Sequence, residues 1–289
     1  HVPRGDGGGS KTRMNGLLAV ARLTLFEAFR KRILVAVLVA GAGFLTLYGL
    51  GLHFMVRGEG GGMALIERRI FLNMLTLAGL FAANFLTIMT AVLLPVDTLS
   101  GEIASGVIQT VAVRPIRRRD IVLGKWLGHW MVMAAYFALL AGGVLTITAL
   151  RSGFTPAKLE IGLPLILLEG TVLLTLSIAG GAKLSTVTNG MLAFGLFGLA
   201  FIGNLVEQIG TMAQNDAARE VGTVASLIMP SEALWQLAAY HMQPSVIRDL
   251  GNSPFSPVSV PSGAMVVWAA GYIVVALSLG IRWFGKRAL

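Results

Sequence analysis

Six stretches of this sequence are apolar over a length that crosses a lipid bilayer. The hydrocarbon core of a bilayer is about 30 Å thick, which an α-helix crosses in about 20 residues. Because the backbone in hydrocarbon must satisfy its own hydrogen bonds, segments of this kind fold as helices. The sequence therefore predicts an all-α integral membrane protein with six transmembrane helices, at residues 33–54, 71–96, 127–150, 161–182, 190–206 and 264–281.

The overall composition excludes a soluble cytosolic enzyme. Only 13% of the 289 residues are charged and 55% are hydrophobic, whereas soluble domains carry about 25% charged residues. The sequence has no Cys and four scattered His, which rules out disulfides and thiolate metal sites and leaves too few ligands for a histidine-built centre. We therefore expect this chain to bind no metal and no cofactor of its own.

Lys and Arg flank the apolar stretches, and their distribution predicts the orientation of the protein. With a cytoplasmic N-terminus, 16 of the 23 basic residues lie in cytoplasmic segments and 7 in outer segments. Basic residues prefer the cytoplasmic side, so we expect a multi-pass protein of the cytoplasmic (inner) membrane with both termini in the cytoplasm. The net charge of +9 comes from these flanking residues, so we expect no nucleic-acid partner.

The N-terminal region divides into a leader and an amphipathic helix. Residues 1–13 read as a protease site and linker from an expression vector, or as a natural flexible leader, and we expect the native chain and its single transmembrane domain to cover residues 14–289. Leu18, Ala21, Leu25 and Phe29 recur at helical spacing between Met14 and Arg32. This pattern predicts an interfacial helix that lies in the headgroups or packs against a cytoplasmic partner.

A cytoplasmic segment, residues 97–126, separates the second and third predicted spans. Ile103, Val107, Ile108 and Val111 fall on one face of a short helix, which Pro115 ends. A loop that only orients the protein would explain the basic residues around Pro115, but it would not explain an apolar helical face. An exposed apolar patch of this kind usually has a partner.

The motifs in this segment resemble those of type-2 ATP-binding-cassette (ABC) permeases. In that family a comparable string follows the second span and includes the coupling helix, and here it comprises Gly101-Glu102, Gly106-Val107-Ile108, Arg114-Pro115-Ile116 and Val122-Leu123-Gly124-Lys125. The six spans, the amphipathic leader and the basic end of the last span also match. Where the family usually has Gly-Thr-Leu, this chain has Gly106-Val107-Ile108, and it looks most similar to the branch of multicopper-enzyme maturation and drug export.

The resemblance implies a permease that is coupled to a separate ATPase. It implies two copies of the ATPase subunit, a second permease copy or a paralogue, and export of substrate across the membrane. The coupling residues that it implies are Glu102, Gly106, Val107, Ile108, Arg114 and Pro115.

The sequence has no nucleotide-binding loop of its own. Gly124-Lys125 is followed by Trp126, and Gly285-Lys286 by Arg287, so neither completes the phosphate-binding motif G-x-x-x-x-G-K-[ST]. We therefore expect a non-catalytic subunit, with ATP and Mg²⁺ bound by the partner ATPase. An ion-coupled secondary transporter and a membrane assembly scaffold are the alternatives that the residues leave open.

A few polar residues lie inside the predicted spans. Glu169 is the only acid among them, and Asn204 lies at a similar depth on the next span. Intramembrane carboxylates usually face a partner or a water-filled cavity. Glu169 and Asn204 therefore either hydrogen-bond to each other across neighbouring helices, or line the translocation path together with Asn84.

Aromatic residues and the long outer loop complete the pattern. Trp126, Trp130, Trp268 and Trp283 lie near the predicted span ends, as in an aromatic belt, and His129 reads as an interfacial side chain. The loop of residues 207–263 contains apolar helical patterns broken by Pro230. This predicts a helical extracytoplasmic loop that acts as a structural lid, an outer gate or a docking surface for an extracytoplasmic partner.

Overall fold

The structure, a computed structural model, describes residues 8–58, 65–101, 117–245 and 259–286. Side chains are described from Gly16 onward. Within these ranges the chain forms helices and no strands, and six helices are long and apolar enough to span a membrane. This confirms the predicted fold class. The six are α2 (Arg32–Gly58), α3 (Leu65–Leu93), α6 (Arg118–Ser152), α7 (Leu159–Gly181), α8 (Thr186–Met212) and α12 (Ala264–Lys286).

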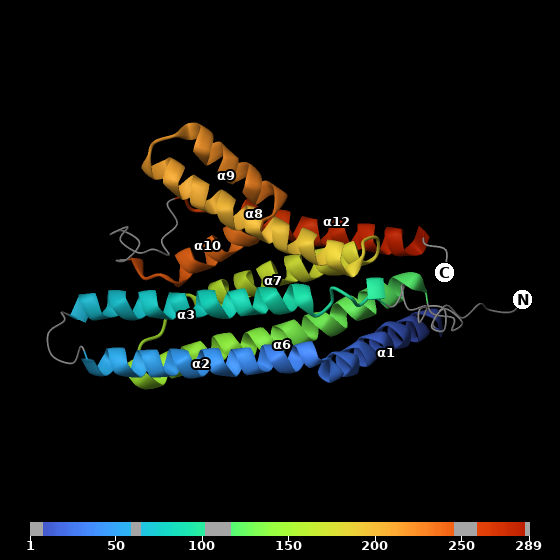
Figure 1. The fold of residues 1–289 in the computed structure, drawn as a ribbon, viewed down its shortest axis with the longest axis horizontal. Coiled ribbons are helices and arrows are strands. Elements are labelled where there is room, and N and C mark those ends of the chain that lie inside the picture. Colours follow the sequence, from blue (N-terminus) through green and yellow to red (C-terminus); the bar gives the residue numbers. More distant parts are fainter. Residues whose placement is uncertain (1–7, 59–64, 102–116, 246–258, 287–289) are drawn as a thin grey trace, which may run out of the picture.

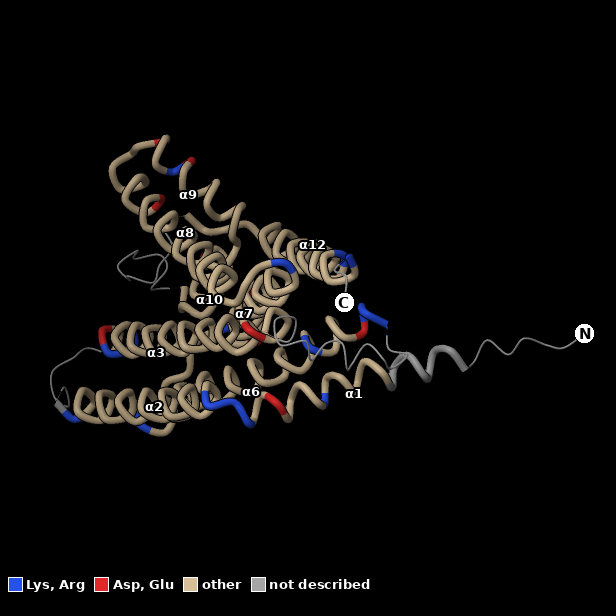
Figure 2. Tube along the Cα trace, turned by 45° about the vertical axis from the view of Figure 1, so that its right-hand side comes forward, with Lys and Arg blue, Asp and Glu red and all other residues tan. Residues whose placement is uncertain are grey.

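Most of these helices extend beyond the predicted apolar stretches. For example, α6 starts at Arg118 and not at residue 127, and α8 ends at Met212 and not at residue 206. The predicted stretches mark only the part of a helix that hydrocarbon requires to be apolar, whereas helical hydrogen bonding continues into the polar flanks. Figure 2 accordingly shows most charged residues toward the helix ends.

Successive spans alternate in direction (Figure 1). The end of α3, the start of α6, the turn between α7 and α8, and the end of α12 lie toward one end of the molecule, where α1 (Gly8–Arg30) also lies. We call this the basic end, because the predicted cytoplasmic segments with their Lys and Arg belong to it. The end of α3 and the start of α6, which flank the predicted coupling segment in the sequence, both lie at the basic end.

The α1 helix packs along the first half of α6. Gly124 and Gly128 of α6 permit this contact, because a Cβ added at Gly124 would lie 2.7 Å from the Cβ of Val20, and one at Gly128 would lie 2.8 Å from the carbonyl oxygen of Ala21. Of the predicted apolar face, Ala21 is buried together with Val20, Thr24 and Ala28, whereas Leu18 and Phe29 are exposed. Leu18 and Phe29 remain available to lipid.

The core lies where α3, α6 and α7 meet. The side chains of α7 are mostly buried, whereas α2 and α12 bury few of theirs and form the periphery. Large residues of the three helices interlock in this core, among them Leu80, Leu140, Ile166 and Leu173. The exposed apolar surfaces of α2 and α12 therefore face lipid or another subunit.

Two shorter helices connect α8 to α12 on the side of the molecule away from the basic end, and they reach toward its middle (Figure 1). They are α9 (Asp216–Ile228) and α10 (Ser231–Met242), and Pro230 lies between them, as the sequence predicts. Small residues let α9 fold back closely on α8: a Cβ added at Gly203 would lie 2.3 Å from the Cβ of Ala225. The α10 helix packs against α7 and is largely buried.

Candidate functional site

The predicted coupling residues Glu102, Gly106, Val107, Ile108, Arg114 and Pro115 lie outside the described residues. The structure does describe the chain that leads to them. We call residues 94–101, between the end of α3 and this segment, the 94–101 turn. It connects α3 to the segment in which the predicted coupling residues lie.

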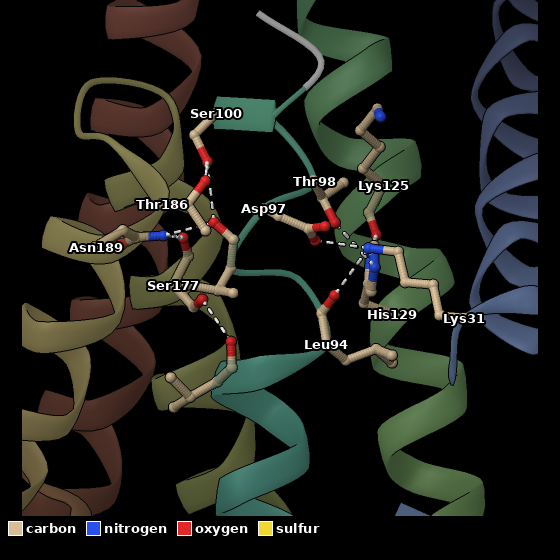
Figure 3. A network of polar contacts seen from close by, with 12 residues as sticks. Lys31, Leu94, Asp97, Thr98, Ser100, Lys125, His129, Ser177, Thr186 and Asn189 are labelled. Carbon is tan, nitrogen blue, oxygen red and sulfur yellow. Dashed lines mark hydrogen bonds and ion pairs between the residues drawn. The ribbon is translucent and has the colours of Figure 1, made fainter. Parts of the chain in front are cut away.

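One side of the 94–101 turn is bound by the junction of α1 and α2. Lys31 lies at this junction, and its Nζ forms an ion pair with Asp97 Oδ1 at 2.6 Å and donates to the carbonyl oxygen of Leu94 at 3.3 Å (Figure 3). The side chains of both Lys31 and Asp97 are partly exposed. Both contacts connect the turn to the junction of α1 and α2, just before the first span.

The same side of the turn contacts α6 through His129. The His129 Nε2 lies 3.2 Å from Thr98 Oγ1, and its Nδ1 lies 2.9 Å from the carbonyl oxygen of Lys125 (Figure 3). His129 is almost fully buried, so the prediction of an interfacial side chain is wrong. The α6 helix starts nine residues earlier than the predicted span, which places His129 within the packed bundle.

The other side of the turn is bound by α7 and α8. Asn189 Nδ2 donates to the carbonyl oxygens of Ser177 at 2.7 Å and Val96 at 3.3 Å, and Ser100 Oγ lies 2.8 Å from Thr186 Oγ1 (Figure 3). Just before the turn, Ser177 Oγ donates to the carbonyl oxygen of Val92 at 3.0 Å. The turn is therefore clamped between two pairs of elements, α1 with α6 and α7 with α8.

Sequence reasoning missed Thr186 and Asn189, the residues of α8 that contact the turn. The one feature of the sequence that points to them is the group of polar residues from Ser185 to Asn189, before the predicted fifth span, in an otherwise apolar region. Polar side chains buried at this level need hydrogen-bond partners, and the 94–101 turn supplies them.

A second polar cluster lies among α3, α7, α8 and α10. In its first half, Asn84 Nδ2 donates to Glu169 Oε2 at 2.9 Å, and both residues are at most 2% exposed. The Oδ1 of Asn84 has no hydrogen-bond partner among the described residues. This contact joins two of the core helices.

The second half of the cluster centres on Asn204. Its Nδ2 donates to Glu232 Oε1 at 2.9 Å, and its Oδ1 accepts from Gln208 Nε2 at 3.2 Å and from Gln236 Nε2. Glu232 and Gln236 belong to α10, so Asn204 binds this short helix to α8. Burial raises the pKa of the Glu232 carboxyl to about 7, although the hydrogen bond from Asn204 opposes this shift.

These contacts differ from the predicted hydrogen bond between Glu169 and Asn204. Glu169 takes Asn84 as its partner, and Asn204 takes Glu232, because α10 packs against both α7 and α8 and brings its own carboxyl to this level. Glu232 and Glu169 are close enough to interact electrostatically. Sequence reasoning missed Glu232 because it lies in the predicted extracytoplasmic loop and outside the predicted spans, where only intramembrane acids were considered.

Two of the predicted belt tryptophans bind α7. Trp126 Nε1 donates to Thr175 Oγ1 at 2.8 Å, Trp130 Nε1 donates to Thr171 Oγ1 at 3.0 Å, and the two indole rings stack with their centroids 6.5 Å apart. Both side chains are only partly buried, so their place in an aromatic belt stays a prediction. Their hydrogen bonds also join α6 to α7.

The polar side chains of both clusters join helices to one another. No group of three or more His, Cys, Asp or Glu that suits a metal ion occurs in the part of the chain that the structure describes. The polar contacts of the 94–101 turn involve residues that directly precede the segment 102–116.

Comparison with known proteins agrees with this architecture. A family model described as ABC-2 family transporter protein matches residues 16–289, which is nearly the whole chain. No curated protein matches the sequence.

Proposed function

The chain belongs to the ABC-2 family of transporter proteins and is a multi-pass membrane permease of an ABC transporter; we propose that it is the exporting subunit, driven by a separate ATPase. The match covers residues 16–289 and six helices suit a membrane. In this proposal the coupling helix is the short helix predicted around residues 103–111, before Pro115, and Glu102, Gly106, Val107, Ile108, Arg114 and Pro115 contact the ATPase.

The clamped 94–101 turn is the observation that carries the proposal. A push on the coupling segment would reach Asp97 and Thr98. Their partners are Lys31, which lies just before the first span, and His129, which lies within the third span, α6. The push would also reach Ser100 and Val96, whose partners lie on α8. A movement of the coupling segment at the basic end would therefore move several helices together.

The proposal includes an ATPase pair and a second permease. Six spans without a nucleotide-binding domain make half of a translocation unit, so a second copy or a paralogue completes it. ATP and Mg²⁺ would bind the ATPase, and this chain would be non-catalytic. The weakly buried helices α2 and α12 offer apolar surface for a second permease.

The outer connection supports a gate or a docking surface. On α9, the apolar side chains that point away from α8 are exposed, including Val221, Val224 and Leu227. Exposed apolar side chains in a helix outside the spans suit contact with the outer leaflet or with an extracytoplasmic partner. Whereas α9 is exposed, α10 is buried, so α10 would act as the fixed part of such a gate.

Cysteine labelling tests the orientation in the cytoplasmic membrane. The sequence has no Cys, so Arg119→Cys and Arg219→Cys each introduce a single thiol, and the parent side chains are similarly exposed at 47% and 51%. A membrane-impermeant maleimide added to intact cells should label position 219 and spare position 119. The reverse pattern would contradict cytoplasmic termini.

Co-purification tests the ATPase partner. The tagged full chain, isolated from membranes of its own organism, should retain a protein with a nucleotide-binding motif that mass spectrometry identifies. Val107→Asp would place a charge in the proposed contact and should lower retention at least tenfold, as truncating a central interface residue does. Val221→Asp is the control, because Val221 is exposed on α9, away from the basic end. Equal retention by both variants would contradict the coupling assignment.

Family membership favours this function over the two alternatives. A secondary transporter would couple transport to an ion through its intramembrane carboxyls, and Glu169 is hydrogen-bonded to Asn84 within the core of a single subunit. An assembly scaffold would need no clamped turn. An ATPase that co-purifies and responds to Val107→Asp would exclude both.

A further inference from the structure

A groove of about 400 Å³ lies between α7, α8 and α12 toward the basic end. Its floor is formed by small residues, Ala179 and Gly180 of α7 and Ala276 of α12, which leave room between the helices. Leu192 of α8 and Val275 of α12 line it and are 41% and 59% exposed. Because these apolar side chains belong to membrane-spanning helices, the groove opens toward hydrocarbon and not toward water.

One end of the groove is cationic. Lys183 lines it from the turn between α7 and α8, and its Nζ lies 5.3 Å from the centroid of the Trp283 ring. Arg282 and Lys286 belong to the last turns of α12, where Figure 2 shows basic residues. The N-terminus of α8, capped by Ser185, also lies at this end and favours negative charge.

The shape and charge suit one kind of occupant. Along α12 the lining runs from Tyr272 to Trp283, which is about 16 Å at the rise of an α-helix and suits a hydrocarbon chain. A cation and an indole ring at the end of an apolar groove suit a phosphate at headgroup level, and basic sites between spans bind anionic headgroups. Both features together match a two-part amphiphile, whereas a second protein helix would not need the cation.

We propose that this groove binds an anionic phospholipid of the cytoplasmic leaflet, with an acyl chain between α7, α8 and α12 and the headgroup phosphate at Lys183. The assignment to the cytoplasmic leaflet rests on the orientation given under Proposed function, whereas the groove itself does not depend on that orientation. The bound lipid would fill the space beside the turn between α7 and α8, next to the residues that clamp the 94–101 turn.

Native mass spectrometry of the detergent-purified full chain tests the proposal. The protein is titrated with dioleoyl-phosphatidylglycerol or dioleoyl-phosphatidylcholine, which have the same chains and differ in charge. The parent protein should retain one phosphatidylglycerol at concentrations where phosphatidylcholine is lost. Equal retention of the two lipids would overturn the proposal.

Two pairs of variants test the headgroup site and the acyl-chain site separately. Lys183→Gln should reduce the preference for phosphatidylglycerol about fivefold, the value of one basic residue at a membrane surface, whereas Lys286→Gln, nearby but outside the groove, should reduce it less. Val275→Trp should fill the groove and weaken retention of both lipids about tenfold, equivalent to about two methylene groups left unburied. Val274→Trp is its control, because Val274 is exposed on the same helix and does not line the groove.

Other outcomes would overturn the proposal. An unchanged lipid preference in Lys183→Gln, or equal binding by the two Trp variants, would remove the headgroup site or the chain site. If Val275→Trp instead dissociated a dimer and left lipid retention unchanged, the groove would be a subunit interface. The assay needs neither the ATPase nor transport, so its failure would leave the proposed permease function standing.

Discussion

At the scale of single residues, Glu169 and Asn84 form a buried pair that joins α3 to α7. Each is at most 2% exposed, and the Asn84 amide donates to the carboxyl at 2.9 Å. A buried polar group without a partner costs about 1–3 kcal/mol. Their burial inside one subunit favours a structural role over a place in the translocation path.

This pair makes a prediction about thermal stability. Glu169→Gln keeps an oxygen that accepts from Asn84 and should melt within about 2 °C of the parent protein, whereas Glu169→Leu leaves the amide unpaired and should lower Tm by several degrees. Thermal unfolding in detergent measures both. A Glu169→Gln variant that keeps its Tm but loses ATPase stimulation would place Glu169 in the translocation path instead. A Glu169→Leu variant that melts and functions like the parent would contradict both roles.

Glu232 makes a prediction about pH. Burial raises the pKa of its carboxyl to about 7, whereas an unfolded Glu titrates near 4.3. The folded state therefore binds the proton more tightly, and this contribution to stability is present at low pH and is lost as pH rises toward and through about 7. The difference amounts to roughly 4 kcal/mol at most.

Melting curves between pH 4.5 and 8 check this sign. The Tm of the parent protein should fall relative to that of Glu232→Gln as pH rises, and the difference should level off above the pKa. Glu220→Gln, which changes an exposed acid on α9, serves as the control and should follow the parent. Parallel curves for the parent and Glu232→Gln would show that Glu232 does not take up a proton in the fold.

At the scale of helices, α1 depends on two glycines of α6. A Cβ at Gly124 would lie 2.7 Å from the Cβ of Val20 on α1, whereas a Cβ at Gly142 on the same helix meets nothing within 4 Å. Gly124→Ala should therefore destabilise the protein by about 1–3 kcal/mol through overpacking. Gly142→Ala should stabilise it by about 0.5–1 kcal/mol through helix propensity. Thermal unfolding that moves in the same direction for both variants would contradict this packing.

The six spans could be predicted from the sequence because a bilayer demands a long apolar helix and few other folds satisfy it. The packing and hydrogen-bond partners of single residues could not be predicted from the sequence, because they depend on which helices are neighbours in the fold. Gly124 gives no sign in the sequence that α1 packs on it. Glu232 and Gln236 make α10 look like a surface segment, whereas their hydrogen bonds to Asn204 allow it to be buried.

At the scale of the whole molecule, the basic end collects the parts that an ATPase would move. The α1–α2 junction, the start of α6 and the turn between α7 and α8 all lie there (Figure 1), and Lys31 of the junction, His129 of α6 and Thr186 of α8 each contact the 94–101 turn. The α9 and α10 helices lie on the side of the molecule away from the basic end. In the proposed mechanism, movement of the ATPase enters at the basic end, passes through the packed helices of the core, and reaches the proposed gate formed by α9 and α10.

The ion pair between Lys31 and Asp97 is the link in this chain of contacts that can be cut with least damage to the fold. Both side chains are partly exposed, and an exposed ion pair contributes about 0–1 kcal/mol to stability. Asp97→Asn should therefore leave Tm and retention of the ATPase close to those of the parent. Asp216→Asn, which changes an exposed acid on α9, provides the matched control.

The most direct test of the account is the rate of ATP hydrolysis by the co-purified complex in liposomes, compared for the parent, Asp97→Asn and Asp216→Asn. If the 94–101 turn transmits force between the ATPase and the helices, the complex with Asp97→Asn should differ severalfold in rate from the parent, while the complex with Asp216→Asn should not. Equal rates for all three complexes, at equal ATPase content, would contradict transmission through this turn.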